Sequence, residues 1–206
     1  MNQWIYSSEQ TLDCRFSTGM MFVQKRPVYC DRGHFSLDIQ GVRFHRDPLT
    51  QRALEPSRYF HDLDVATSEG QLWAQWLVGG LQISLDEESL PPSERMTWNH
   101  TSKQGLVCFQ GTLRGQDEAH VTVKEHIVDD TRIWTMNVFG IPSLDDADAF
   151  PRHFLRLEHA ALEAESFLKW RLLKQPTVSR DLPELNKNPV FVEAISEPGV
   201  RSPKMG

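Results

Sequence analysis

The chain has 206 residues, with 39% apolar and 24% charged side chains, which are ordinary values for a globular protein. No apolar run reaches the roughly 18 residues that a membrane-crossing helix needs, and the N-terminus lacks the pattern of a signal peptide. The net charge of −6 argues against a nucleic-acid binder, because neutralisation of phosphates usually needs a basic surface. Only three cysteines are present, Cys14, Cys30 and Cys108, so we expect a reducing, cytoplasmic location and no membrane partner.

The first 63 residues predict short strands separated by turns. Alternating apolar residues at Leu12, Cys14 and Phe16 are typical of a half-buried strand. By the same pattern we expect four strands, over residues 11–17, 19–29, 34–42 and 57–63. Residues 3–8, and later 97–101, are candidates for a further strand at the edge.

A helix follows the fourth predicted strand. Asp64 stands where an N-cap is expected, and Gly79-Gly80 is a natural stop. One face of this helix has the spacing of a buried stripe, formed by Leu63, Ala66, Gly70, Trp73 and Leu77. A second helix carries the corresponding stripe Leu157, Ala160/Ala161, Ala164, Phe167/Leu168 and Arg171/Leu172. The strand preceding it places Trp134, Met136 and Val138 inward.

The two halves of the chain resemble each other at an offset of 94 residues. Pairing residues 4–18 with 98–112 gives six identities, and pairing residues 57–78 with 151–172 gives six more. In total, 12 of the 37 paired positions are identical. The sequence therefore predicts an α+β fold made by tandem duplication of an antiparallel four-stranded sheet followed by one helix, related by a pseudo-two-fold axis. The predicted parts are a first repeat over 1–83, a linker over 84–96, a second repeat over 97–174 and a proline-rich irregular tail over 175–206.

No catalytic motif is present in the sequence. The eight histidines do not pair with carboxylates at metal-binding spacings, so neither a metal site nor another cofactor is expected. Cys14 and Cys108 occupy equivalent positions, and we expect both to be small core residues that point inward. The chain is not expected to be an enzyme.

Aromatic and basic residues offer a candidate binding surface. Trp4 and Trp98 stand at equivalent positions, where they either stack on nucleobases or cap the core of each sheet; the core cap is favoured. Residues 14–58 contain eight Lys or Arg against four acids. In the third strand we expect His34, Ser36, Asp38 and Gln40 to point outward, away from the helix.

The segment GHFSLDIQ (33–40), followed after a loop by RYFHDLD (58–64) and a helix, resembles the Whirly and Pur-alpha-like proteins. Those families repeat a four-strand-plus-helix unit, and the resemblance covers 11–78 and 105–172 as a pattern. It implies that Lys25, Arg26, Tyr29 and Lys124 contact single-stranded DNA or RNA. A unit of strands followed by a helix also resembles the small modules of the plant AP type, whose sheet enters the major groove of duplex DNA.

The sequence therefore favours a non-enzymatic protein that binds single-stranded DNA or RNA through exposed sheet faces, with the first repeat as the preferred location. The candidate contact residues are Lys25, Arg26, Tyr29, Arg32, His34, Arg43, Arg46, Lys124, Trp4 and Trp98. The alternative is a protein-interaction or regulatory module that forms a homo-oligomer or binds a protein partner. An enzyme with a cleft between the repeats is a weaker third possibility.

Overall fold

The computed structural model describes residues 4–8, 11–16, 18–25, 33–46, 53–78, 88–103, 106–128, 130–141 and 151–173. Within these residues the chain forms two antiparallel sheets of five strands, and each sheet is followed in sequence by one helix. The α+β class and the twice-repeated order of sheet and helix agree with the sequence-based prediction. The predicted count of four strands is one short, because each sheet has an additional edge strand, and these two strands lie where the sequence offered candidates, at residues 4–8 and 96–103.

The first unit is a simple meander in which each strand pairs with the next. Its elements are β1 (Trp4–Ser8), β2 (Thr11–Phe16), β3 (Gly19–Lys25), β4 (Phe35–Gln40), β5 (Tyr59–Phe60) and α1 (Leu63–Leu77). The N-cap of α1 is Asp62 and not Asp64, because the Asp62 carboxylate accepts hydrogen bonds from the backbone N–H groups of Asp64 and Val65.

The second unit repeats this order with longer strands. Its elements are β6 (Met96–Lys103), β7 (Leu106–Leu113), β8 (Gln116–Val128), β9 (Thr131–Phe139), β10 (Arg152–Phe154) and α2 (Leu157–Leu173). The predicted buried stripe of α2 is confirmed from Leu157 to Leu168, while Arg171 and Leu172 are half-buried. Residues 88–95, within the predicted linker, contact this unit: Ser93 donates to Glu165 of α2, and Glu88 accepts from the backbone N–H of Leu157.

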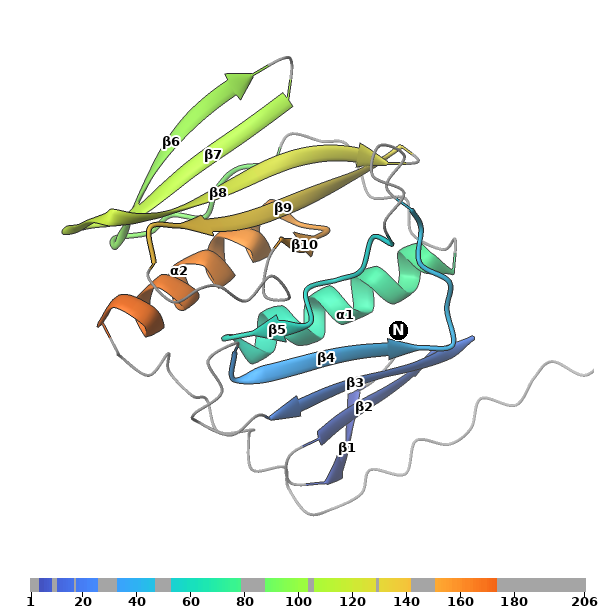
Figure 1. Cartoon of the computed structure of the whole chain (residues 1–206). Coiled ribbons are helices and arrows are strands. Elements are labelled where there is room, and N and C mark those ends of the chain that lie inside the picture. The colour runs from blue at the N-terminus through green and yellow to red at the C-terminus, as the bar shows by residue number, and fades with distance from the viewer. Residues whose placement is uncertain are drawn as a thin grey trace, which may run out of the picture.

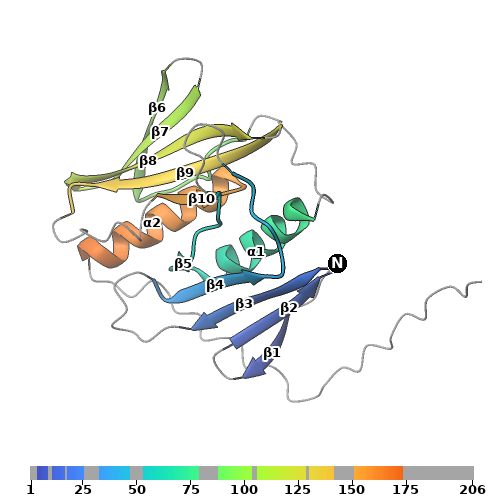
Figure 2. The same cartoon turned by 45° about the vertical axis from the view of Figure 1, so that its right-hand side comes forward.

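The two helices lie between the two sheets (Figures 1 and 2). Helix α1 packs on β3, β4 and β5 of the first sheet, and α2 packs on β7 to β10 of the second. The helices also touch each other. Each sheet therefore turns its apolar face toward the middle layer and its other face outward.

Buried side chains from both units form the core of this middle layer. In α1 they include Ala66, Gly70 and Trp73 as predicted, together with Glu69, which was not; Leu63 and Leu77 are only partly buried. Gly70 brings the helix close to the sheet, since a Cβ there would lie 2.9 Å from Leu37 Cδ1. The core also holds the predicted Trp134 and Met136.

The two cysteines that align in sequence lie on different faces of their sheets. Cys14 is fully buried and pairs with Met21, which is also in the core. Cys108 is half-buried and pairs with the exposed Lys124 on the outer side. The prediction that Cys108 points inward is wrong, because the β6–β7 hairpin is longer than β1–β2 and an odd shift in register reverses the face of every side chain.

Candidate functional site

The ten residues predicted to contact nucleic acid do not gather on one surface. Arg26, Tyr29 and Arg32 lie outside the described residues. Lys25 is in β3, where it pairs with Phe35, but its side chain is not described. The remaining predicted residues divide between the segment after β4, the core, the contact between the units and the second sheet.

Arg43 and Arg46 are exposed in the segment between β4 and β5. This segment folds back on itself: Arg46 forms a bridge with Ala53, and Leu54 donates a backbone hydrogen bond to His45. These two arginines therefore lie in the connection between β4 and β5, whereas Lys124 lies within β8 of the second sheet.

Both tryptophans near the start of a unit pack against the core. Trp4 and Trp98 are half-buried, and a Cβ on Gly70 of α1 would lie 3.4 Å from Trp4 Cζ2. The Trp98 ring covers Gly111, where a Cβ would lie 2.6 Å from Cζ3. These contacts are those expected of a core cap, the favoured interpretation of the two residues.

In the third predicted strand, Asp38 and Gln40 are exposed on the outer face as expected. His34 differs, because it is half-buried and its ring contacts Trp170 of α2, with ring centres 5.9 Å apart. His34 therefore belongs to the contact between the units and not to an open sheet surface.

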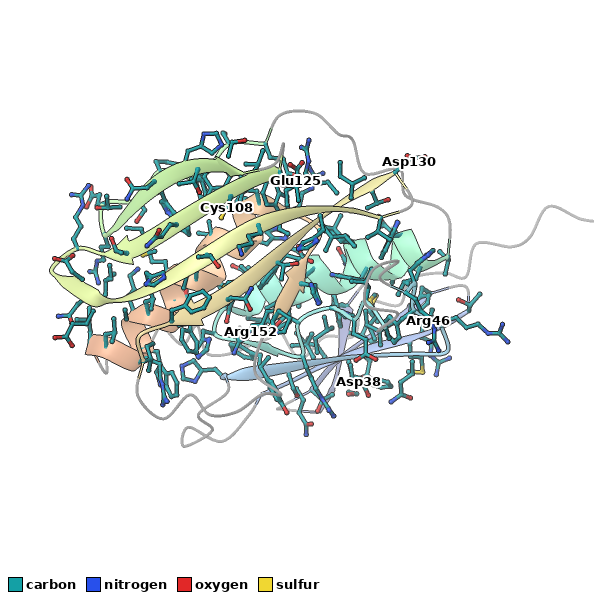
Figure 3. The ribbon with its side chains drawn as sticks, turned by 45° about the horizontal axis from the view of Figure 1, so that its top comes forward. Asp38, Arg46, Cys108, Glu125, Asp130 and Arg152 are labelled. Carbon is teal, nitrogen blue, oxygen red and sulfur yellow. The ribbon has the colours of Figure 1, made fainter. Side chains whose placement is uncertain are left out.

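The outer side of the second sheet carries mostly polar side chains. Its centre is Lys124, which is exposed and pairs with Cys108 on one side and Thr135 on the other. Figure 3 shows Cys108 on the second sheet, on the opposite side of the molecule from Asp38 of β4. Ile133 and Thr135 of β9 are buried, so the accessible part extends over β6, β7, β8 and the end of β9.

We call this surface the β6–β9 face. Its accessible, cross-paired positions with described side chains carry hydroxyls, amides, imidazoles, one lysine, one thiol, one leucine and one phenylalanine: Thr97, Asn99, Thr101, Leu106, Cys108, Gln110, Thr112, His120, Thr122, Lys124, His126, Asn137 and Phe139. None of these described positions is Asp or Glu. Asp117 and Glu118 are exposed near the start of β8, outside the paired positions. At one end of the face the rings of His120 and Phe139 stack, with centres 5.1 Å apart and an angle of 20° between them.

The outer side of the first sheet has a different character. Register places Asp13, Phe22 and Asp38 in one row across it, with Arg15 nearby. Two carboxylates on a small face repel an anionic polymer. The sequence predicted the binding surface in the first repeat because of its basic residues. The described part of this outer face does not support that location.

A second polar cluster lies buried between the two units. Glu163 of α2 is completely buried and accepts hydrogen bonds from both the backbone N–H and Nδ1 of His61, which follows β5; the Nδ1–Oε1 distance is 2.7 Å. Arg152 of β10 donates to the same Oε1 atom at 2.7 Å and is 2% exposed. Figure 3 shows Arg152 between the two sheets. We call these three residues the Glu163 cluster.

A related cluster surrounds Glu69 of α1, which the 94-residue offset pairs with Glu163. Glu69 is also completely buried, and it accepts from the backbone N–H of Leu155 in the second unit at 2.9 Å. Its other donors are Trp73 Nε1 at 2.9 Å and His159 Nδ1 at 2.7 Å. We call these four residues the Glu69 cluster. Each helix thus supplies a carboxylate that holds the backbone of the other unit.

Burial controls the protonation of the Glu163 cluster. Removal from water lowers the pKa of His61 below its ordinary value, and this outweighs the attraction of Glu163. Burial also lowers the pKa of Arg152, with Glu163 opposing the shift. His61 is therefore a neutral imidazole at pH 7 that donates its Nδ1 proton to the carboxylate.

One feature of the sequence indicates these clusters. Glu69 and Glu163 recur at the same offset and interrupt the apolar face of their helices, and a recurring acid at an inward position indicates a buried acceptor. Nothing in the sequence identifies the donors from the opposite unit, because His61, for example, lies 102 residues away from Glu163 in the chain.

Among the described residues, no group of three or more His, Cys, Asp or Glu side chains is placed to hold a metal ion. None of the described helices has the length and apolar character required to cross a membrane. The chain matches no protein-family model, no curated protein and no solved structure.

Proposed function

We propose that the protein binds single-stranded DNA or RNA, without catalysis, through the β6–β9 face. The observation that supports this proposal is the composition of the face: a lysine at its centre, hydrogen-bonding side chains around it and no carboxylate at its described paired positions. A surface of this kind can bind one phosphate group without repelling the neighbouring phosphates of the same strand.

Each type of side chain on the β6–β9 face suits one part of a single strand. Lys124 provides a cation for a phosphate group. Exposed amides such as Asn99 can donate to and accept from base edges, which are accessible in a single strand. Phe139 is 46% exposed and backed by His120, so it offers an aromatic surface on which a base can stack.

The same face is poorly suited to duplex DNA. A duplex presents a dense double row of phosphates, whereas Lys124 is the one cation among the side chains of the β6–β9 face that the structure describes. We therefore expect preference for single strands, modest affinity and a shallow salt dependence.

The test is fluorescence anisotropy of the full chain with labelled single-stranded and duplex oligonucleotides over a salt series. We expect Phe139→Ala to weaken single-strand binding about tenfold, since stacking contributes roughly 1–3 kcal/mol per base. Lys124→Gln is expected to weaken binding at low salt and to reduce the slope of log affinity against log salt by about 0.7. The matched control is Arg15→Gln, which removes an exposed cation from the outer side of the first sheet.

Two results would overturn the proposal. One is the absence of single-strand binding by the wild-type chain at low ionic strength. The other is binding that Arg15→Gln reduces while Phe139→Ala and Lys124→Gln leave it unchanged, because the interface would then lie on the first sheet.

A further inference from the structure

His61 is a buried imidazole whose two ring nitrogens have different surroundings. Nδ1 donates to Glu163 Oε1 at 2.7 Å, so in the neutral ring Nε2 carries the lone pair. The His61 side chain is completely buried, and no group in the described chain forms a hydrogen bond with Nε2. A carboxylate that fixes one nitrogen of an imidazole is the arrangement that orients histidine ligands toward metal ions.

A second imidazole lies beside the first. The ring centres of His34 and His61 are 5.3 Å apart and their planes are inclined by 80°. Two imidazoles bound to one ion at about 2.1 Å, with a tetrahedral angle between them, have ring centres about 5 Å apart. The observed spacing is therefore compatible with a shared ion after small side-chain rotations.

We propose that His34 and His61 form a binding site for a divalent transition-metal ion, with Glu163 positioning His61. Imidazole nitrogen favours Zn²⁺, Cu²⁺ and Ni²⁺ over Mg²⁺ or Ca²⁺, which prefer oxygen. Two protein ligands leave the remaining coordination positions to water or a small external ligand. His34 is half-buried, whereas the side chain of His61 is completely buried.

Aromatic packing alone accounts for only part of this arrangement. Trp170 and Phe167 of α2 surround His61, with ring centres 5.2 Å and 5.4 Å away. Such packing explains why the ring is buried, but it supplies no hydrogen-bond donor of ordinary strength to the Nε2 lone pair. A bound cation satisfies that lone pair and leaves the bond from Nδ1 to Glu163 intact.

The molecule contains a matched comparison for this site. His159 also donates Nδ1 to a buried carboxylate, Glu69, at 2.7 Å. In the described residues we find no second imidazole in ring contact with His159, so the proposal predicts no metal binding there.

The experiment titrates the full chain, freed of metal by a chelator and exchanged into metal-free buffer, with Cu²⁺ in the presence of glycine as a weak competitor. Cu²⁺ quenches nearby indoles, and Trp170 lies beside both rings, with centres 5.9 Å from His34 and 5.2 Å from His61. We expect saturable quenching at one ion per chain. Trp170→Phe should remove most of the quenching without changing the stoichiometry.

His34→Gln and His61→Gln should each weaken Cu²⁺ binding about tenfold or more, while the control His159→Gln should leave it unchanged. Circular dichroism checks that each variant is folded. If His61→Gln does not fold, the affinity of His34→Gln for Cu²⁺ decides the question. The electron paramagnetic resonance spectrum of Cu²⁺ bound to His34→Gln should then show one nitrogen ligand fewer than that of the wild type. Equal affinity in wild type and His34→Gln, or weakening by His159→Gln alone, would overturn the assignment and indicate adventitious binding to other histidines.

Discussion

Glu69 and Glu163 occupy corresponding positions in the two helices, and each accepts a hydrogen bond from the backbone of the other unit. Their remaining partners differ. Glu163 holds Arg152, which is 2% exposed, and His61, which is completely buried. Glu69 holds Trp73 and His159, whose side chain is 18% exposed. The same residue at the same position thus supports a buried ion pair in one cluster and a partly exposed pair in the other.

This difference shows how the two units depend on each other. A buried carboxylate is tolerated only when donors satisfy its oxygens, and for both glutamates one donor is a backbone N–H from the opposite unit. Separation of the units would leave both carboxylates short of a partner. We therefore expect the chain to unfold as one cooperative body.

The largest effect is expected for Glu163→Ala, which leaves the buried guanidinium of Arg152 without its carboxylate. Removal of one partner from a buried ion pair destabilises a protein by about 3–5 kcal/mol. Urea unfolding followed by circular dichroism measures this change. If Glu163→Ala and Glu69→Ala lower the free energy of unfolding by the same amount, the structural difference between the two clusters does not affect stability.

A double variant tests whether the loss comes from the ion pair itself. Arg152→Met combined with Glu163→Leu removes both charges and replaces them with apolar side chains of similar length. The combined loss should be clearly smaller than the sum of the two single losses, because neither charge is then left unpaired. Additive losses would contradict the assignment of the effect to the Arg152–Glu163 pair.

A smaller loss is expected for Glu69→Gln, which keeps the shape of the side chain but removes its charge. Leu155 and Trp73 both donate to Oε2, a role that an amide oxygen can keep, whereas an amide nitrogen in place of Oε1 cannot accept the hydrogen bond from His159 Nδ1. Loss of one buried hydrogen bond costs about 1–3 kcal/mol. Urea unfolding measures this loss, and an unchanged midpoint would refute the role of the bond between His159 and Glu69.

The two aligned cysteines test whether the two sheets differ in which face is buried. Cys14 is fully buried in the first sheet, so Cys14→Ala should cost about 1 kcal/mol through lost packing. Cys108 is half-buried on the outer side of the second sheet, and Cys108→Ala should be nearly neutral. Thermal unfolding distinguishes these results. Equal midpoints for the two variants would mean that the register difference does not separate core from surface.

The smallest effect is the pH dependence contributed by His61. Burial lowers the pKa of His61 below 6.5, so at pH values just under 6.5 the unfolded chain binds more protons at this residue than the folded one. Stability should therefore be retained above pH 6.5 and decline as the pH falls below it. The urea midpoint, measured with a chelator present, should decline less steeply between pH 7.5 and 5.5 in His61→Gln than in the wild type. Equal slopes would contradict a contribution of His61 to the pH dependence of stability.

Much of each unit was predictable from short-range pattern. Alternation identified β2, β4 and β9, and the stripe of α2 was buried as expected, because side-chain direction within an element follows its local backbone geometry. The N-cap was misplaced by two residues, since Asp62 and Asp64 are both suitable caps and only the helix start distinguishes them. The candidate site was less predictable. A basic stretch in sequence does not specify which sheet face its side chains reach, and Lys124 alone of the predicted lysines and arginines lies on the β6–β9 face.

The sequence by itself determined that strands precede a helix twice, and that Glu69 and Glu163 correspond. Only the tertiary structure decided which face Cys108 occupies and which groups satisfy the two carboxylates. The physical reason is that strand register depends on hairpin length and on the surface against which a sheet packs, and neither is encoded within a single strand. The donors from the opposite unit lie 86, 90 and 102 residues from their glutamate in the chain, so they become neighbours only when the two units close around the shared core.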